Sequence, residues 1–273
     1  MKILFAKQTL RTYQRAHNIL TSLDPAANPY ACISPGSAQP RGTIVVFPGS
    51  FNPPTSAHLA MLQQARTFAR HQGGCWQVYA ALSKYSVDKE AVERMTLLDR
   101  VMLLERVLTG QGAHAGIMLL NRGLYVEQGL GIRVAFPRVR RLFFLVGFDK
   151  IVQILDPRYY TERDAPLREL FSRAQLLVAP RGANGERELA ELLARPENRP
   201  FASSIRLLPL AERYREMSSS QIRQNAQSSE IPALARDFIW RTHPYNTPSY
   251  PATASPQIDL YAERTRALQE LLR

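Results

Sequence analysis

Short apolar segments alternate with amphipathic segments along most of this chain, and this alternation restricts the fold more than any other feature. Apolar, often β-branched segments bounded by turn residues predict strands at residues 43–47, 76–82, 116–120, 142–146, 175–179 and 205–208. Helical spacing predicts helices around residues 55–70, 89–108, 186–194 and 220–227. A strand that is apolar at every position is buried on both faces. The sequence therefore predicts an α/β fold with a doubly wound parallel sheet.

The two ends of the chain differ from this central pattern. Residues 1–23 carry basic residues and no acid, with apolar positions at helical spacing, and residues 243–256 are rich in Pro, Ser, Thr and Tyr. We predict a helical N-terminal extension and connector (1–41), a central domain (42–242), and a Pro-rich linker with a terminal helix (243–273). Deletion of this tail is expected to leave the chemistry intact. A mitochondrial transit peptide is the alternative interpretation of the N-terminal segment.

The composition limits the classes of partner. The chain has 273 residues and a formal net charge of +12 at pH 7, which favours anionic partners such as nucleotides. Nucleic acid is not favoured, because basic residues are not interleaved with aromatic ones, and Trp76 and Trp240 are expected in the core. No apolar run approaches the ~20 residues that span a bilayer, so no membrane partner is expected. Because the chain has only two cysteines, a reducing compartment is the default, and we expect a cytoplasmic location. The sequence leaves open whether the chain forms a homo-oligomer.

A dense group of turn-forming and polar residues follows the first predicted strand. From residue 48 to residue 59 it reads Pro-Gly-Ser-Phe-Asn-Pro-Pro-Thr-Ser-Ala-His-Leu. Ligands bind at this end of the strands in such sheets, and Gly49 permits close approach of the backbone. Thr55 is a suitable N-cap for a helix whose N-terminus attracts an anion, and His58 can donate a hydrogen bond to a phosphate oxygen there. A structural cap and a satisfied, partly buried histidine are the alternative.

A second hydroxyl-rich segment lies near the end of the central domain. Residues 217–223 read Met-Ser-Ser-Ser-Gln-Ile-Arg. The serines can cap a following helix, and Arg223 lies one turn into that helix, where it can bind phosphate through two parallel hydrogen bonds. An ordinary serine N-cap is the alternative interpretation.

These two segments resemble the signatures of the nucleotidyltransferase superfamily. The first resembles GxFxPxxxxHL with its (H/T)xGH core, although Ala57 stands where that core has glycine, and the second resembles (I/M)SS(T/S)xIR. Three further segments, 99–104, 145–149 and 178–182, resemble the adenylyltransferases that act on nicotinamide or nicotinate mononucleotide. All five segments occur in the family's order over about residues 42–239. Residues 156–160 depart from the aromatic segment that follows in that family.

The resemblance implies a Rossmann-like nucleotidyltransferase fold and an enzyme that joins ATP to a pyridine mononucleotide, releasing pyrophosphate. It implies that Mg²⁺ is held by phosphates and water, with no metal site made of protein residues. The residues expected to contact the reacting phosphates are His58, Thr55 and Arg223. Those expected to bind ATP are Gly49, Ser50, Phe51, Ser219, Ser220 and Arg223. Those expected to bind the acceptor or its phosphate are Lys84, Lys89, Arg100, Gly147, Asp149 and Arg181; for the two lysines, solvated surface residues are the alternative.

Two other functions stay open. The acceptor could be another phosphorylated small molecule, such as phosphopantetheine or a glycerol phosphate. The chain could also be a nucleotide-sensing or RNA-binding protein on the same fold, because Ala57 and the net charge of +12 leave room for weakened catalysis. Salt-sensitive RNA binding without release of pyrophosphate would favour this last function.

Overall fold

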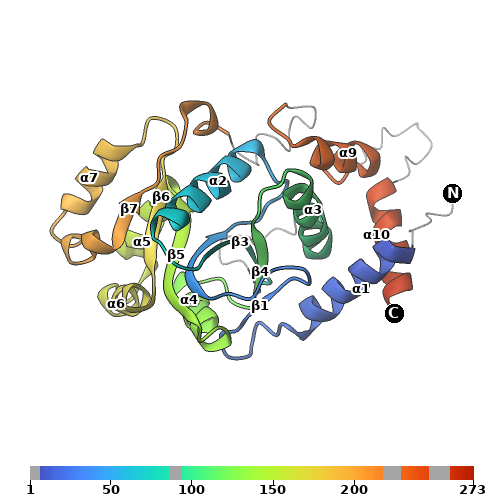
Figure 1. Ribbon diagram of the computed structural model, residues 1–273, viewed down its shortest axis with the longest axis horizontal. Helices are drawn as coiled ribbons and strands as arrows, with labels where there is room; N and C mark the ends of the chain where they lie inside the picture. Colours follow the sequence, from blue (N-terminus) through green and yellow to red (C-terminus); the bar gives the residue numbers. More distant parts are fainter. Residues whose placement is uncertain (1–6, 86–93, 218–228, 246–258) are drawn as a thin grey trace.

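The computed structural model describes residues 7–85, 94–217, 229–245 and 259–273 (Figure 1). These residues form a seven-stranded sheet in the order β1-β4-β3-β2-β5-β6-β7. Every neighbouring pair is parallel except β1 with β4. The strands are β1 (Ala31–Ile33), β2 (Gly42–Pro48), β3 (Trp76–Ser83), β4 (Gly116–Leu120), β5 (Val139–Gly147), β6 (Gln175–Ala179) and β7 (Ile205–Leu207).

The order of the parallel strands determines where a ligand can bind. The chain winds from β2 outward through β3 and β4, and then crosses to β5 on the other side of β2. This is the doubly wound order of dinucleotide-binding folds, in which ligands bind at the carboxyl ends of the strands where the winding reverses. The predicted fold class is confirmed, and β1 is an additional antiparallel edge strand within the predicted connector.

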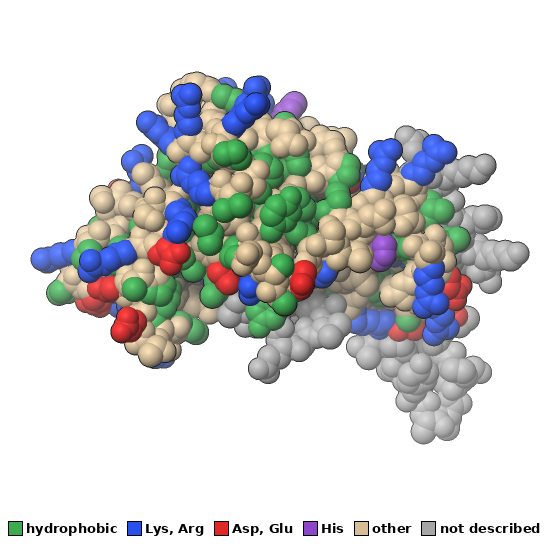
Figure 2. All heavy atoms as spheres, turned by 90° about the horizontal axis from the view of Figure 1, so that it is seen from below, with side chains coloured by type: hydrophobic (Ala, Val, Ile, Leu, Met, Phe, Trp, Pro, Cys, Tyr) green, Lys and Arg blue, Asp and Glu red, His purple; other side chains and the backbone are tan. Residues whose placement is uncertain are grey.

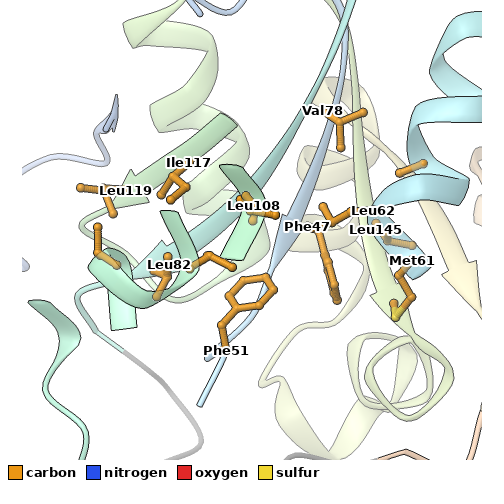
Figure 3. Close-up of a cluster of buried hydrophobic side chains, with 14 of the residues drawn as sticks. Phe47, Phe51, Met61, Leu62, Val78, Leu82, Leu108, Ile117, Leu119 and Leu145 are labelled. Atoms are coloured by element: carbon orange, nitrogen blue, oxygen red, sulfur yellow. The ribbon is translucent and has the colours of Figure 1, made fainter. Parts of the chain in front are cut away.

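Helices cover both faces of the sheet (Figure 1). Along β2, Val45 and Phe47 belong to the hydrophobic cluster on one face, whereas Ile44 and Val46 belong to the cluster on the other face. Figure 3 shows part of the first cluster, including Phe47. The helices that contribute to the first cluster are α1 (Lys7–Ser22), α2 (Ser56–His71), α3 (Leu97–Gly110) and α10 (Leu260–Leu272). Those that contribute to the second are α4 (Tyr125–Ala135), α5 (Phe148–Leu155), α6 (Asp164–Arg173) and α7 (Glu186–Ala194).

A further helix, α9 (Ala233–Thr242), packs on α3 and α10 through a third cluster. Short 3₁₀ turns complete the described chain at η1 (Pro157–Tyr159), η2 (Arg199–Ser204) and η3 (Glu212–Tyr214). Within the described ranges, no helix has the length and apolarity needed to cross a membrane.

The two terminal helices are tied to the central domain by a buried polar network. Asp99, near the start of α3, is 1% exposed and accepts hydrogen bonds from Tyr13 of α1 (3.1 Å) and Tyr261 of α10 (2.8 Å). It also forms an ion pair with Arg264 of α10 at 2.8 Å. Breaking a buried pair of this kind by removing one partner typically costs about 3–5 kcal/mol. Both terminal segments, outside the predicted boundaries at residues 41 and 242, therefore share a core with the central domain. The division into three parts stays a prediction.

Several local predictions differ from the structure. The helix expected at 89–108 begins at Leu97, because Thr96 caps it by accepting a hydrogen bond from the Asp99 backbone N–H. The expectation that Trp240 lies in the core is wrong, since it is 71% exposed on α9. Helix α4 was not predicted because its glycines weaken the helical pattern. A Cβ at Gly131 would lie 2.8 Å from the Tyr30 backbone nitrogen, so close packing requires this glycine.

Candidate functional site

The loop after β2 folds over its own aromatic side chain. Phe51 has a left-handed backbone conformation (φ 45°), and its fully buried ring meets the Phe47 ring edge-to-face, with centroids 5.4 Å apart. A Cβ at Gly49 would lie 3.0 Å from the Phe51 ring. A side chain at position 49 would therefore need the Phe51 ring to shift by a few tenths of an ångström. In the same loop, the Asn52–Pro53 peptide bond is cis, and the Asn52 side chain is fully buried.

Thr55 and His58 form a reciprocal capping box at the start of α2. The Thr55 hydroxyl accepts a hydrogen bond from the His58 backbone N–H at 3.2 Å, and the Thr55 backbone N–H donates to His58 Nδ1 at 3.0 Å. The Thr55 hydroxyl also lies 3.0 Å from Nδ1, and the side chain is 2% exposed. Thr55 therefore fixes the position of the imidazole, and its hydroxyl is engaged by His58.

The same contacts define the protonation of His58. Because Nδ1 accepts a backbone hydrogen bond, the neutral ring carries its proton on Nε2. The half-buried ring lies near Phe51 and Phe47, at centroid distances of 4.9 and 5.8 Å. Burial lowers the pKa of His58 to about 4. At neutral pH the residue is thus an uncharged hydrogen-bond donor whose ring orientation is fixed.

Few backbone N–H groups at the start of α2 are left for a ligand. The N–H of Ser56 donates to the Glu230 carbonyl at 2.8 Å, and that of His58 donates to Thr55. The N–H of Ala57 has no partner among the described residues. Of the N–H groups expected to be free at the start of α2, only that of Ala57 therefore has no partner among the described residues. Ala57 directly precedes His58 in the sequence.

A residue from the predicted linker contacts this loop directly. The Tyr245 hydroxyl donates a hydrogen bond to Asn52 Oδ1 at 2.7 Å. Sequence reasoning missed both residues; the only signal was a polar Asn within an otherwise tightly constrained loop. This contact argues against the expectation that deletion of residues 243–273 leaves the chemistry intact.

Two residues predicted to bind the acceptor or its phosphate instead donate hydrogen bonds to backbone carbonyls. Arg100 Nη1 donates to the Ser50 carbonyl at 3.2 Å, so this arginine supports the loop from α3. Lys84, which follows β3, donates through Nζ to the Leu20 carbonyl near the end of α1, at 2.8 Å. Their observed contacts are structural, and their roles in substrate binding stay predictions.

The remaining acceptor residues come together at the ends of β5 and β6. Asp149 and Arg181 form an ion pair at 2.5 Å, with side chains 60% and 48% exposed. Gly147 ends β5, and a Cβ there would have nothing within 4 Å. Since β5 neighbours β2, this open pair and the Thr55–His58 pair lie at the same edge of the sheet.

Other predicted residues cannot be placed. Lys89, Ser219, Ser220 and Arg223 lie outside the described residues, as does most of the second hydroxyl-rich segment. Within the described residues, no group of three or more His, Cys, Asp and Glu side chains could hold a metal ion.

Comparisons with known proteins identify the family of this chain. A protein of Schizosaccharomyces pombe (strain 972 / ATCC 24843), named "Putative nicotinamide mononucleotide adenylyltransferase", is 30% identical over 145 residues. The match covers 52% of this chain and 55% of that protein, so the chain spans about half the length of this relative. A solved structure, described as a "Putative Nicotinate-nucleotide Adenylyltransferase from Vibrio parahaemolyticus", is 14% identical with a TM-score of 0.43, over 76% of this chain and 96% of its own. Residues 46–225 match the family described as cytidylyltransferase-like, and the chain belongs to that family.

Proposed function

We propose that this protein joins ATP to the phosphate of nicotinamide or nicotinate mononucleotide, forming a dinucleotide and releasing pyrophosphate. The observation that carries the proposal is the Thr55–His58 pair at the end of β2, where the winding of the sheet reverses. Family membership supports nucleotidyl transfer, and the name of the S. pombe relative supports a pyridine mononucleotide as the acceptor.

The reaction needs little proton transfer. A phosphate monoester has a second pKa of about 6, so the acceptor phosphate is mostly a dianion at neutral pH and can attack the α-phosphorus directly. The phosphorus–oxygen bond to pyrophosphate breaks as the new one forms. The protein's task is to position the two reactants in line and to stabilise the charge that develops on the α-phosphate.

His58 and Ala57 supply the donors for that charge. The Nε2–H of neutral His58 and the N–H of Ala57 would both donate to α-phosphate oxygens, at the positive end of the α2 dipole. Thr55 would hold the His58 ring in position through its hydroxyl, and the buried Phe51 ring would pack against the imidazole. Gly49 and Ser50 would present their backbone to ATP, while Ser219, Ser220 and Arg223 are proposed to hold the β- and γ-phosphates.

The acceptor would bind beside β5 and β6. Asp149 would accept hydrogen bonds from ribose hydroxyls, and Arg181 would contact the acceptor phosphate. An exposed ion pair contributes only about 0.2–1 kcal/mol in water, so a ligand can separate these partners at low cost. The space beside Gly147 lets a nucleotide approach the backbone of this strand end.

Mg²⁺ is proposed to enter with ATP as part of the substrate. Its hard oxygen ligands would be phosphates and water. The bound ion would reduce the negative charge of the triphosphate.

The face shown in Figure 2 bears on the RNA-binding alternative. Its Lys and Arg side chains are scattered singly and in small groups between apolar and neutral residues. A surface that tracks a nucleic-acid backbone usually gathers such residues into a stripe. The described residues on the face in Figure 2 form no continuous stripe of this kind.

A pyrophosphate-release screen of the purified protein tests the proposal. ATP and CTP are each paired with nicotinamide mononucleotide, nicotinate mononucleotide, phosphopantetheine and glycerol phosphate, in the presence of Mg²⁺. We expect turnover with ATP and a pyridine mononucleotide. Turnover with another acceptor alone would replace the proposed substrate, and salt-sensitive RNA binding with no turnover in any pair would overturn catalysis.

A further inference from the structure

A cavity of about 420 Å³ lies where the two terminal helices meet the central domain. None of its lining residues belongs to the candidate site described above. Figure 1 shows α1 and α10 side by side next to α3 and α9. The cavity is lined by Thr9 and Tyr13 of α1, Met102, Leu103 and Arg106 of α3, Asp237, Phe238, Arg241 and Thr242 of α9, and Arg264 of α10. It therefore exists only when both terminal helices are docked.

The inner part of this cavity is mostly apolar and firmly packed. Met102, Leu103 and Phe238 are each at most 9% exposed. Arg264, 8% exposed, stacks on the Phe238 ring at 5.2 Å and donates to the Tyr13 hydroxyl at 2.7 Å. A volume of this size, with apolar walls and a few fixed polar groups, is typical of sites for small molecules.

The mouth of the cavity carries excess positive charge. Arg106 is exposed and makes no hydrogen bond or ion pair within the described residues. Arg241 binds Asp237, the one carboxylate among the lining residues, through Nε at 2.7 Å. Arg264 is balanced by Asp99 behind the wall. The charge of Arg106 is thus uncompensated, and guanidinium groups match the planar geometry of phosphate and carboxylate oxygens.

We infer that this cavity binds a small oxyanion, a phosphate or carboxylate carried on an apolar or aromatic body. Arg106 and Arg241 hold the oxyanion at the mouth, and the body lies against Phe238 and Met102. Because the cavity requires docked α1 and α10, a bound ligand stabilises the folded protein by mass action. The inference does not depend on the proposed reaction, since its measurements are binding and melting.

The test is isothermal titration of the full chain at constant ionic strength with two probes, phenyl phosphate for phosphate and benzoate for carboxylate. We expect saturable binding of at least one probe and a higher melting temperature in its presence. The double variant Arg106→Ala/Arg241→Ala should bind at least tenfold more weakly at this site. The matched control Arg236→Ala/Arg266→Ala removes the same charge from α9 and α10 outside the cavity, and it should bind within twofold of wild type.

A third variant is expected to bind the probes more tightly than wild type. Asp237→Asn removes the only carboxylate on the lining and releases Arg241, so binding should become severalfold tighter. If the cavity double variant does not fold, Arg106→Gln alone replaces it, since this side chain is exposed and makes no hydrogen bond or ion pair within the described residues. Phenyl phosphate and benzoate that fail to saturate, or that bind equally well to the cavity variants and to wild type, would overturn the inference.

Discussion

At the end of β2, Thr55 and His58 are held by reciprocal hydrogen bonds against buried aromatic rings, whereas at the ends of β5 and β6 Asp149 and Arg181 form an ion pair that water reaches freely. The first pair has one geometry, and its environment keeps the imidazole neutral. The second pair is screened and can rearrange around a ligand. If the proposed function holds, the fixed half of the site would carry the bond-making chemistry and the adaptable half would recognise the acceptor.

The largest effect is expected from His58→Ala. Removing one preorganised donor to a developing negative charge typically costs about 10²–10³ in turnover. ATP affinity should change far less, because the donor acts chiefly in the transition state. Turnover and the KM for ATP measure this directly. Near-normal turnover in a folded His58→Ala protein would remove His58 from the mechanism.

His58→Gln is the matched control, because Gln at the third helical position can also complete a capping box. This variant should keep the melting temperature of wild type. His58→Ala should lower it, because loss of the cap costs ~1 kcal/mol of stability. Turnover should stay low in both variants. A Gln variant that recovers full turnover would show that His58 only caps the helix.

Tyr245→Phe is expected to have the next largest effect. Loss of the hydrogen bond to Asn52 loosens the loop that carries His58, so turnover should fall about tenfold, equivalent to ~1.4 kcal/mol. The control is Tyr79→Phe, which loses a hydrogen bond of the same 2.7 Å length, from Tyr79 to the Ala38 carbonyl. Equal turnover losses in the two variants, measured on folded protein, would show that the Tyr245 contact supports stability alone.

Arg181→Ala tests the adaptable half. The KM for the acceptor should rise severalfold, while stability changes by no more than ~0.5 kcal/mol because the ion pair is exposed. The matched variant Arg187→Ala breaks the exposed pair with Glu191 on α7 and should leave the KM unchanged. An unfolding temperature lowered by Arg181→Ala, with an unaltered KM, would assign Arg181 a structural role.

The last prediction concerns stability against pH. The pKa of His58 is about 4 in the folded chain and about 6.5 when unfolded, so the unfolded state binds more protons between these values. The His58 contribution is therefore fully present above pH 6.5 and is lost as the pH falls toward 4. Urea unfolding of wild type and His58→Gln from pH 4 to 8 should show similar stabilities above pH 6.5 and a wild type that becomes progressively less stable than the variant as the pH falls toward 4. Parallel curves would contradict the low pKa.

Much of the fold could be predicted because its signals are local. A continuously apolar strand such as β2 indicates burial on both faces. The Thr55–His58 pair consists of two residues only three positions apart at the start of a helix. The approach of Asp149 to Arg181 was predictable as a shared sheet edge, since parallel strands end on the same side. The roles of these residues in catalysis and binding stay predictions, as do the oligomeric state and the cytoplasmic location.

Contacts between distant segments were beyond sequence reasoning. Nothing near Tyr245 indicates that it binds Asn52, and nothing near Ser56 indicates that the Glu230 carbonyl occupies its N–H. Helix α4 was missed because Gly131 reduces helix propensity, while packing against Tyr30 requires that glycine. In each case tertiary packing determines the outcome, and one sequence alone does not record it.

The bond between Tyr245 and Asn52 joins residues 193 positions apart, and this has a consequence for the newly made protein. A ribosome delivers the chain from its N-terminus, so the strands and α2 can assemble before Tyr245 has been synthesised. The loop that leads into α2 acquires this hydrogen bond only after residue 245 has emerged. Nascent chains that end before Tyr245 would thus hold a folded sheet with a less firmly held loop before His58.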